Sequence, residues 1–474
     1  MMKAKLKFTG LDANRRIANL IILSVLFSLV FSISIFVRGY FLGNNSLPGT
    51  DAYFSVNVAR DIVNFRDNPA IDSGAVPELI WPLFIAFFSI IFRVHEEFSI
   101  IALSLIFGIL SLILTYFIID KLGFRKRNLA IAFFLISPAT IWMFSTYSKF
   151  ILPFFFSLLT LYLLLAGKYA ISLIMLGITC LFGAVSGLSV IVFSVLGFKK
   201  GFWNWLWKAI IIFFVLTSII YFLFPVFPEF SFSLENIFSL FSSLSEYGIN
   251  LFAFLLAFIG IVITWRERRE RRELFLIYIV FIILLALSIL NKDFVFFFNF
   301  ILIFLAAIGF TKLLERNWAS GLIKGLALLI LIIGLATPLI VMPLRIASSA
   351  PGNDMLEALK FLRPQEGGAV LSAGENGHWI EGIARKEVFI DGFKSRIDPV
   401  LEAEALALLR ERNIERLNRE FSSKGIKYIL LDPSTRKIFR TKDEGILLLL
   451  LYTDRFEKVY DKDSIEIWKF RAAV

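Results

Sequence analysis

Residues 17–37 read IANLIILSVLFSLVFSISIFV, a stretch of the chain without a single charged side chain. About twenty apolar residues in a helix span a hydrocarbon core that is about 30 Å thick. Runs of this kind recur along the chain as far as residue 344. Of the 474 residues, 58% are hydrophobic and 54 are phenylalanine, which exceeds the average composition of water-soluble domains. The composition therefore predicts a multi-pass α-helical membrane protein.

Beyond Arg345 the composition changes, and no later apolar run is long enough to cross a bilayer. From residue 346 onward there are 21 Lys and Arg and 21 Asp and Glu, so this segment is neutral. The net charge of +11 belongs to residues 1–345, where basic residues flank the apolar runs. That distribution is typical of membrane topology and argues against a nucleic-acid partner. We expect a transmembrane domain over residues 1–345 and a separate domain over residues 346–474.

The basic loops predict the orientation in the cell membrane. The basic amino end, with Arg15 and Arg16, is expected in the cytoplasm, followed by a first outer loop over residues 38–97. The apolar run 79–92 is short for a crossing and is expected to lie at the outer face. A second large outer loop covers residues 225–250. About eleven spans result, over residues 17–37, 98–119, 129–144, 150–166, two within 171–198, 209–224, 251–265, 274–290, 294–310 and 325–344.

The last crossing places residues 346–474 on the extracytoplasmic side. Helical periodicity is seen over residues 354–362 and 399–421, and short buried strands are expected at 369–372 and 428–432. Residues 456–470 alternate between apolar and polar side chains and predict a hairpin at the edge of a sheet. The C-terminal domain is therefore predicted to be α/β.

An acidic side chain stands just after the first span, in Gly49-Thr-Asp51-Ala-Tyr-Phe54. At this place it lies within reach of a lipid head group, where a carboxylate can bind a divalent cation or activate an acceptor. The structural alternative is a solvated loop acid, or an N-cap for a helix that begins near Ala52.

Four further motifs follow in order. They are Asp72-Ser-Gly-Ala-Val-Pro-Glu-Leu-Ile-Trp-Pro-Leu83, Ser243-Leu-Ser-Glu246, Val370-Leu-Ser-Ala-Gly-Glu-Asn-Gly-His-Trp-Ile380, and Ala384-Arg-Lys386 with Ile390-Asp-Gly392. Together with the Asp51 motif, this series resembles the catalytic subunit of oligosaccharyltransferase. That family belongs to the GT-C superfamily of membrane glycosyltransferases that use polyprenyl-phosphate donors, and the resemblance leans towards its archaeal members.

The resemblance implies a GT-C fold and the transfer of a sugar or oligosaccharide from a polyprenyl-linked donor in the bilayer to a glycan or protein acceptor. Asp51 would correspond to the family's first metal-binding or catalytic acid. Glu246 would correspond to the glutamate that holds metal and acceptor. Residues 370–380 match the frame of the family's Trp-Trp-Asp motif, so Glu375 and Trp379 become candidates for acceptor binding.

Three departures leave alternatives open. Ser148 and Phe150 stand where the family has a pair of acids, and Ala373-Gly374-Glu375 replaces Trp-Trp-Asp. Lys292-Asp-Phe294 stands in place of Arg-Phe. Asp51 and Glu246 alone form a small ligand set for Mg²⁺ or Mn²⁺. The alternatives are that Lys149 neutralises the donor phosphate without metal, or that the chain binds lipid-linked glycan or a partner subunit without catalysis.

Basic residues on the outer face run against the usual charge distribution of membrane proteins. Arg60, Arg66, Lys149 and Lys292 are therefore candidates for contacts with the donor phosphate. The two histidines, His95 and His378, show no metal-ligand spacing in the sequence and are interpreted as structural.

Overall fold

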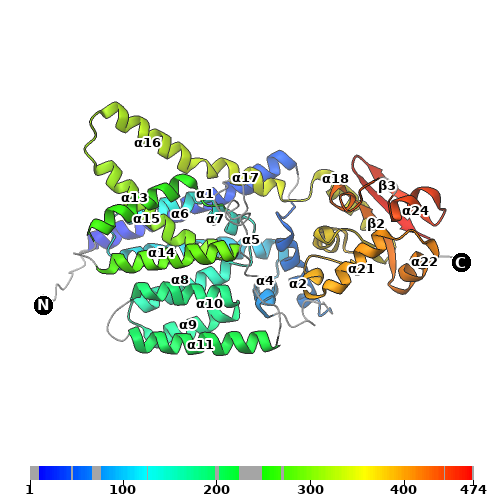
Figure 1. The fold of residues 1–474 in the computed structure, drawn as a ribbon, viewed down its shortest axis with the longest axis horizontal. Helices are drawn as coiled ribbons and strands as arrows, with labels where there is room; N and C mark the ends of the chain where they lie inside the picture. The colour runs from blue at the N-terminus through cyan, green and yellow to red at the C-terminus, as the bar shows by residue number, and fades with distance from the viewer. Residues whose placement is uncertain are drawn as a thin grey trace. The chain divides into compact units, whose positions relative to one another are not determined.

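The computed structural model describes residues 10–43, 46–66, 76–124, 126–197, 202–223, 248–267, 272–441 and 444–471, and Figure 1 shows their arrangement. The chain divides into two units. The first comprises Met1–Val37 and Ile101–Ile346, and the second comprises Arg38–Ile100 and Ala347–Val474. Segment 38–100 and the C-terminal segment are thus far apart in sequence and packed together in space. The boundary predicted near residue 345, between a transmembrane domain and a C-terminal domain, stays a prediction.

The first unit consists of apolar helices. They are α1 (Gly10–Leu42), α5 (Glu96–Lys121), α6 (Arg127–Ile136), α7 (Pro138–Ser145), α8 (Ile151–Leu165), α9 (Tyr169–Leu181), α10 (Ala184–Ser194), α11 (Phe202–Leu223), α13 (Leu251–Glu267), α14 (Arg272–Leu290), α15 (Val295–Glu315), α16 (Gly321–Ala336) and α17 (Pro338–Ser348). Helices α8 and α9 pack on each other, α10 packs on α8, and α11 packs on α9 (Figure 1). Residues 295–311 of α15 are buried throughout, so α15 forms the centre of this unit.

Each predicted apolar span contains an apolar helix. Among the described residues, five helices are long and apolar enough to cross a membrane, or six when one bent pair is included. The remaining apolar helices are 10–17 residues long. The prediction of several apolar helices is confirmed, and the number of eleven crossings stays a prediction.

The predicted span over residues 129–144 consists of two helices, α6 and α7. They meet at an angle of 60°. Proline fixes φ, has no N–H to donate, and drives the preceding residue out of the helical region. Ser137 is accordingly extended, with ψ 133, directly before Pro138. Across this break, the Ser137 hydroxyl donates to Asn299 of α15 at 2.7 Å.

Helices α13 and α15 approach closely through two glycines. A Cβ at Gly309 would collide with the Leu256 carbonyl oxygen and lie 3.0 Å from the Gly260 nitrogen, while a Cβ at Gly260 would lie 3.1 Å from the Leu305 carbonyl carbon. Since these neighbours are backbone atoms, they cannot rotate away. Small residues of this kind let membrane helices pack backbone to backbone.

We expect Gly309→Ala to lower the melting temperature of the purified chain by several degrees, because overpacking of this kind costs about 1–3 kcal/mol. Gly325→Ala is the matched control, since an added Cβ there meets nothing within 4 Å. The measurement is a thermal unfolding curve in detergent. Equal melting temperatures for the two variants would contradict the close approach of α13 and α15.

The second unit contains a four-stranded sheet in the order β1-β2-β4-β3. The strands are β1 (Ala369–Leu371), β2 (Ile426–Leu431), β3 (Phe456–Lys462) and β4 (Ile465–Phe470). β1 pairs with β2 in parallel, and the other two pairs are antiparallel. The predicted strands and the edge hairpin are confirmed.

Alternate residues of β2 face two different cores. Tyr428 and Leu430 face a cluster with α18 (Asn353–Leu362) and Ile380. Ile429 and Leu431 face the opposite cluster, which is covered by α21 (Pro399–Arg410), α22 (Ile414–Ser423) and α24 (Ile446–Tyr452). The single helix predicted over residues 399–421 is wrong, because residues 411–413 interrupt it. The Asn413 side chain accepts from the Glu415 and Arg416 nitrogens and so caps a new helix.

Candidate active site

Asp51 lies in the first turn of α2 (Thr50–Val63), in the second unit. It is exposed, whereas the eight residues from Ala52 to Ala59 are buried. The preceding Gly49 has φ 73, a backbone conformation that L side chains rarely adopt, and its nitrogen donates to Ser349 at 3.1 Å. The positive end of the helix dipole favours a carboxylate at this position. Asp51 is therefore a solvent-facing acid on a firmly packed helix.

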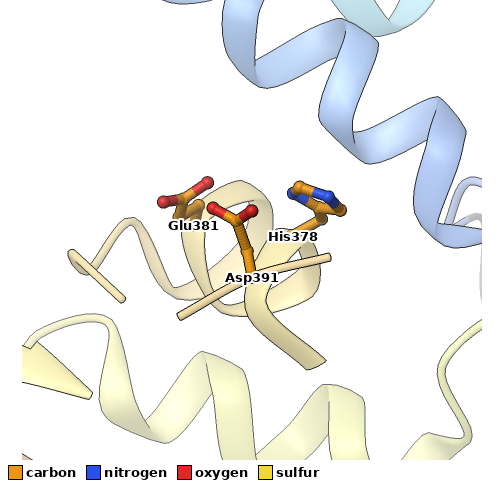
Figure 2. Close-up of side chains that lie close together, drawn as sticks. All are labelled: His378, Glu381 and Asp391. Carbon is orange, nitrogen blue, oxygen red and sulfur yellow. The ribbon is translucent and has the colours of Figure 1, made fainter. Parts of the chain in front are cut away.

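His378, Glu381 and Asp391 form a cluster in the same unit (Figure 2). Each offers one ligand atom, and these atoms lie within 4.8 Å of one another. Figure 2 shows the two carboxylates turned towards the same space beside the imidazole. One nitrogen and two carboxylate oxygens form a donor set that suits Zn²⁺ or Mn²⁺.

The cluster depends on a close approach of two segments. His378 and Glu381 come from one continuous helical turn, α19 (Gly377–Trp379) followed by a π-helix (Ile380–Ala384). Asp391 comes from the loop that passes beneath it. A Cβ at Gly377 would lie 2.6 Å from the Asp391 Cα and 2.8 Å from the Ile390 carbonyl oxygen. Only glycine at position 377 allows the loop to come this close.

Asp391 and Lys394 form the hydrogen bonds and ion pairs that surround the cluster. One oxygen of Asp391 accepts from the backbone nitrogens of Phe393 and Lys394, each at 2.7 Å. The other oxygen lies 3.7 Å from the Lys394 ammonium, which is also 3.6 Å from Glu381. Lys394 donates to the Val388 carbonyl at 2.9 Å. The ammonium partly neutralises the two carboxylates and would compete with a cation.

Burial governs the protonation of the cluster. It lowers the pKa of His378, which is 5% exposed, while the charges of Asp391 and Asp51 act in the opposite direction. Burial also raises the pKa of Glu381 to about 7, with Lys394 opposing it. The His378 Nδ1 atom is buried and has no hydrogen-bond partner in the described part of the chain. A buried nitrogen without a partner is costly.

Helix α2 packs directly on this cluster. The Asn57 amide donates to the His378 carbonyl at 3.0 Å. The Phe54 ring lies 5.2 Å from the imidazole and 4.9 Å from the Phe393 ring, centroid to centroid. Because the charge of Asp51 acts on the imidazole, the fold brings the acid predicted from the sequence into the electrostatic range of His378.

The structure places the other predicted site residues as follows. Arg60 faces Glu97 at 3.6 Å and donates to the Gly382 carbonyl at 3.5 Å. Arg66 and Glu375 are exposed. Trp379 packs against the core cluster next to α18. Glu246 lies outside the described residues.

Lys149 and Lys292 belong to the first unit. The Lys149 ammonium lies 5.8 Å from the centroid of the Phe150 ring, and Lys292 begins a short 3-10 helix. Ser148 is buried, and the Phe150 ring packs on Phe296 at 5.2 Å. The positions where the family resemblance led us to expect two acids are therefore occupied by a buried hydroxyl and an aromatic contact. All these site assignments stay predictions.

Asp432 anchors the loop that carries Glu375. Its carboxylate accepts from the Thr435 nitrogen at 2.9 Å and from the Asn376 amide at 2.9 Å. Asn376 also donates to the Ser372 hydroxyl at 3.0 Å. Burial by itself would raise the pKa of Asp432, but the hydrogen bonds from Thr435 and Ser434 lower it below its ordinary value.

We expect Asp432→Ala to destabilise the chain by about 2–4 kcal/mol, because it removes a helix cap and leaves buried donors unpaired. Since the pKa of Asp432 is lowered on folding, its ionised form stabilises the fold above the unfolded pKa, and this contribution is lost as the pH falls through the folded pKa. Thermal unfolding at several pH values measures both effects. Asp398→Ala, which removes an exposed helix cap, is the control and should cost less at pH 7.

Sequence reasoning missed the role of His378. Glu381 stands three residues after it, a spacing that places two side chains on one helical face. The spacing of His378 and Glu381 was visible in the sequence, but no helix could be assigned to these residues. Asp391 is too distant in sequence to be paired with His378 by spacing. The cluster follows from the loop contact at Gly377.

No protein-family model matches the chain, and no curated protein matches it. The fold is that of the GT-C glycosyltransferases. The oligosaccharyltransferase of Archaeoglobus fulgidus in its apo form is 13% identical, with a TM-score of 0.59 over 86% of this chain and 69% of that one. ArnT from Cupriavidus metallidurans, bound to undecaprenyl phosphate, is 15% identical, with a TM-score of 0.52 over 95% and 97%. The arabinofuranosyltransferase AftD from Mycobacteria is 12% identical, with a TM-score of 0.53 over 94% and 40%. At these identities the likeness establishes the fold.

Proposed function

We propose that this chain is a membrane glycosyltransferase that moves a sugar or oligosaccharide from a polyprenyl-phosphate-type donor to a glycan or protein acceptor. The observation that carries the proposal is the packing of the Asp51 helix on the His378, Glu381 and Asp391 cluster. The GT-C fold supports it. Solved neighbours hold undecaprenyl phosphate in ArnT, and an inhibitory peptide with a dolichol-phosphate in an archaeal oligosaccharyltransferase.

In this proposal residues 1–345 form a transmembrane domain of about eleven spans, with the N-terminus in the cytoplasm. Residues 346–474 form the extracytoplasmic domain. The bias of Lys and Arg towards the predicted cytoplasmic loops supports this orientation. The lipid tail of the donor lies in the bilayer, and its head group meets Asp51 at the outer face.

A divalent cation fits the cluster better than it fits Asp51 and Glu246 alone. His378, Glu381 and Asp391 would hold it, and Asp51 would add a negative charge nearby. The mixed nitrogen and oxygen donors favour Zn²⁺ or Mn²⁺ over Mg²⁺. A crystal structure of the Archaeoglobus fulgidus oligosaccharyltransferase contains Zn and sulfate. When bound, such a cation supplies positive charge to the departing phosphate.

The chain's own residues have the following roles. The acceptor atom bonds to the anomeric carbon of the donor sugar, the bond from that carbon to the phosphate oxygen breaks, and the lipid phosphate leaves with the bonding electrons. The Asp51 carboxylate takes the acceptor's proton. Arg60, Arg66, Lys149 or Lys292 would stabilise the departing phosphate. Glu246, Glu375 and Trp379 position the acceptor.

The test is a transfer assay with the purified full chain in detergent and radiolabelled polyprenyl-linked glycans from its own host, with and without chelator. Transfer that chelation abolishes supports the enzyme with a bound cation. Transfer that survives chelation supports the alternative in which Lys149 neutralises the phosphate without metal. Binding of lipid-linked glycan without transfer to any host acceptor would reject the enzyme and support the non-catalytic alternative, which the missing acids at positions 148 and 150 favour.

A further inference from the structure

The second unit contains a cavity of about 600 Å³, separate from the cation cluster. It lies between α2, α18 and the π-helical turn, and Tyr53, Glu97, Lys360, Arg363 and Arg385 contribute to its lining. Its volume falls in the range of about 300–1,000 Å³ that small-molecule sites occupy. A single phosphate would fill only a small part of it, and the lining is mainly polar, so a lipid tail would gain little from burial there.

The cavity has an excess of positive charge. Lys360, Arg363 and Arg385 have no carboxylate within ion-pair distance among the described residues. The two acids of the lining are already paired, Glu97 with Arg60 at 3.6 Å and Glu357 with Lys462. In the described residues, the three cations of the lining therefore form no ion pair, whereas both of its acids do.

The cationic side chains around the cavity repel one another. Burial, together with the charges of Arg60 and Arg363, lowers the pKa of the Arg385 guanidinium, while Glu97 and Glu96 oppose the shift. Holding like charges close together costs free energy, and an anionic ligand bound between them would offset that cost.

The backbone holds Arg385 at this place. It follows the π-helix with φ 54 and ψ 40, a left-handed conformation that is uncommon for a residue other than glycine. The turn before it is pressed against α2: a Cβ at Gly382 would lie 2.6 Å from the Tyr53 ring and 3.0 Å from the Asn57 side chain. The turn that precedes Arg385 is therefore packed closely against α2.

We propose that this cavity binds an acidic saccharide, a glycan segment of a few sugar residues that carries carboxylate groups. Guanidinium groups bind carboxylates through two parallel hydrogen bonds, and the polar lining offers partners to sugar hydroxyls. The inference rests on the proposed function for the role of this glycan as a substrate, but binding itself can be measured without catalysis.

The experiment is equilibrium binding by calorimetry to the full chain in detergent. The probes are trigalacturonic acid and the neutral trisaccharide maltotriose, with inorganic phosphate as the third ligand. We expect trigalacturonic acid to bind at least about tenfold more tightly than maltotriose, with an affinity that falls as salt is raised. The double variant Arg363→Gln, Arg385→Gln should lose this preference. Arg419→Gln, which changes an exposed arginine of α22, is the matched control.

Equal affinity for the two trisaccharides would overturn the inference, and so would unchanged binding by a double variant that keeps the wild-type melting temperature. Phosphate that binds as tightly as trigalacturonic acid would reduce the site to a simple anion site and reject the saccharide. Failure of the proposed function would give a different result. If the chain binds trigalacturonic acid but transfers no glycan, the acidic-saccharide site is supported and the glycosyltransferase function is rejected.

Discussion

Asp51→Asn is expected to lower the rate of glycan transfer by about 10²–10⁴-fold while leaving the fold intact, because a positioned general base contributes rate enhancements of that order. Asparagine keeps the size of the side chain and removes both its charge and its ability to take the acceptor's proton. Asp51 is exposed, and no side-chain hydrogen bond of α2 depends on its carboxylate in the described structure. The melting temperature should therefore change little, and radiolabelled glycan transfer is the measurement.

The control for this variant is Glu402→Gln, which changes an exposed acid of α21. Donor binding by Asp51→Asn separates the two roles of the carboxylate. Wild-type binding with lost transfer indicates the base, whereas loss of both indicates a contact with the donor head group. A variant that transfers glycan at the wild-type rate would remove Asp51 from the chemistry and favour the non-catalytic alternative.

His378→Ala is expected to abolish stoichiometric binding of Zn²⁺ or Mn²⁺. The wild-type chain should retain one ion after dialysis, measured by elemental analysis, and the variant should lose at least about 100-fold in affinity. Removal of a residue that only supports a ligand already costs about 10–100-fold. The donor set provides one nitrogen and two carboxylates, so the imidazole is the ligand that distinguishes these ions from Mg²⁺.

Two further variants make this result specific. His95→Ala changes the other histidine of the chain and should keep the ion. Lys394→Met removes the ammonium that lies 3.6 Å from Glu381 and 3.7 Å from Asp391, so it should bind the ion more tightly than the wild type. If the cluster is only an internal ion pair, wild-type protein retains no metal after dialysis, and Lys394→Met lowers the melting temperature without any gain in binding.

Several local features of the fold could be predicted from the sequence. The apolar spans, strands β1 and β2 and the hairpin of β3 and β4 were predicted because each depends on the periodicity of a few consecutive side chains. The position of Asp51 just after the first span was readable for the same reason. The bend between α6 and α7 also depends on a local signal, Ser137-Pro138. It was not predicted, because the surrounding residues form a continuous apolar run.

Long-range contacts were decided only by the tertiary structure. His378 and Asp391 meet because Gly377 lets the helical turn and the loop approach until a Cβ would lie 2.6 Å from the Asp391 Cα. The cationic cavity arises because α2 packs against α18 and the turn before Arg385, which lie hundreds of residues further along the chain. A sequence shows the periodicity of each segment, whereas the free energy of bringing two segments together depends on shape, burial and charge that exist only after both have folded.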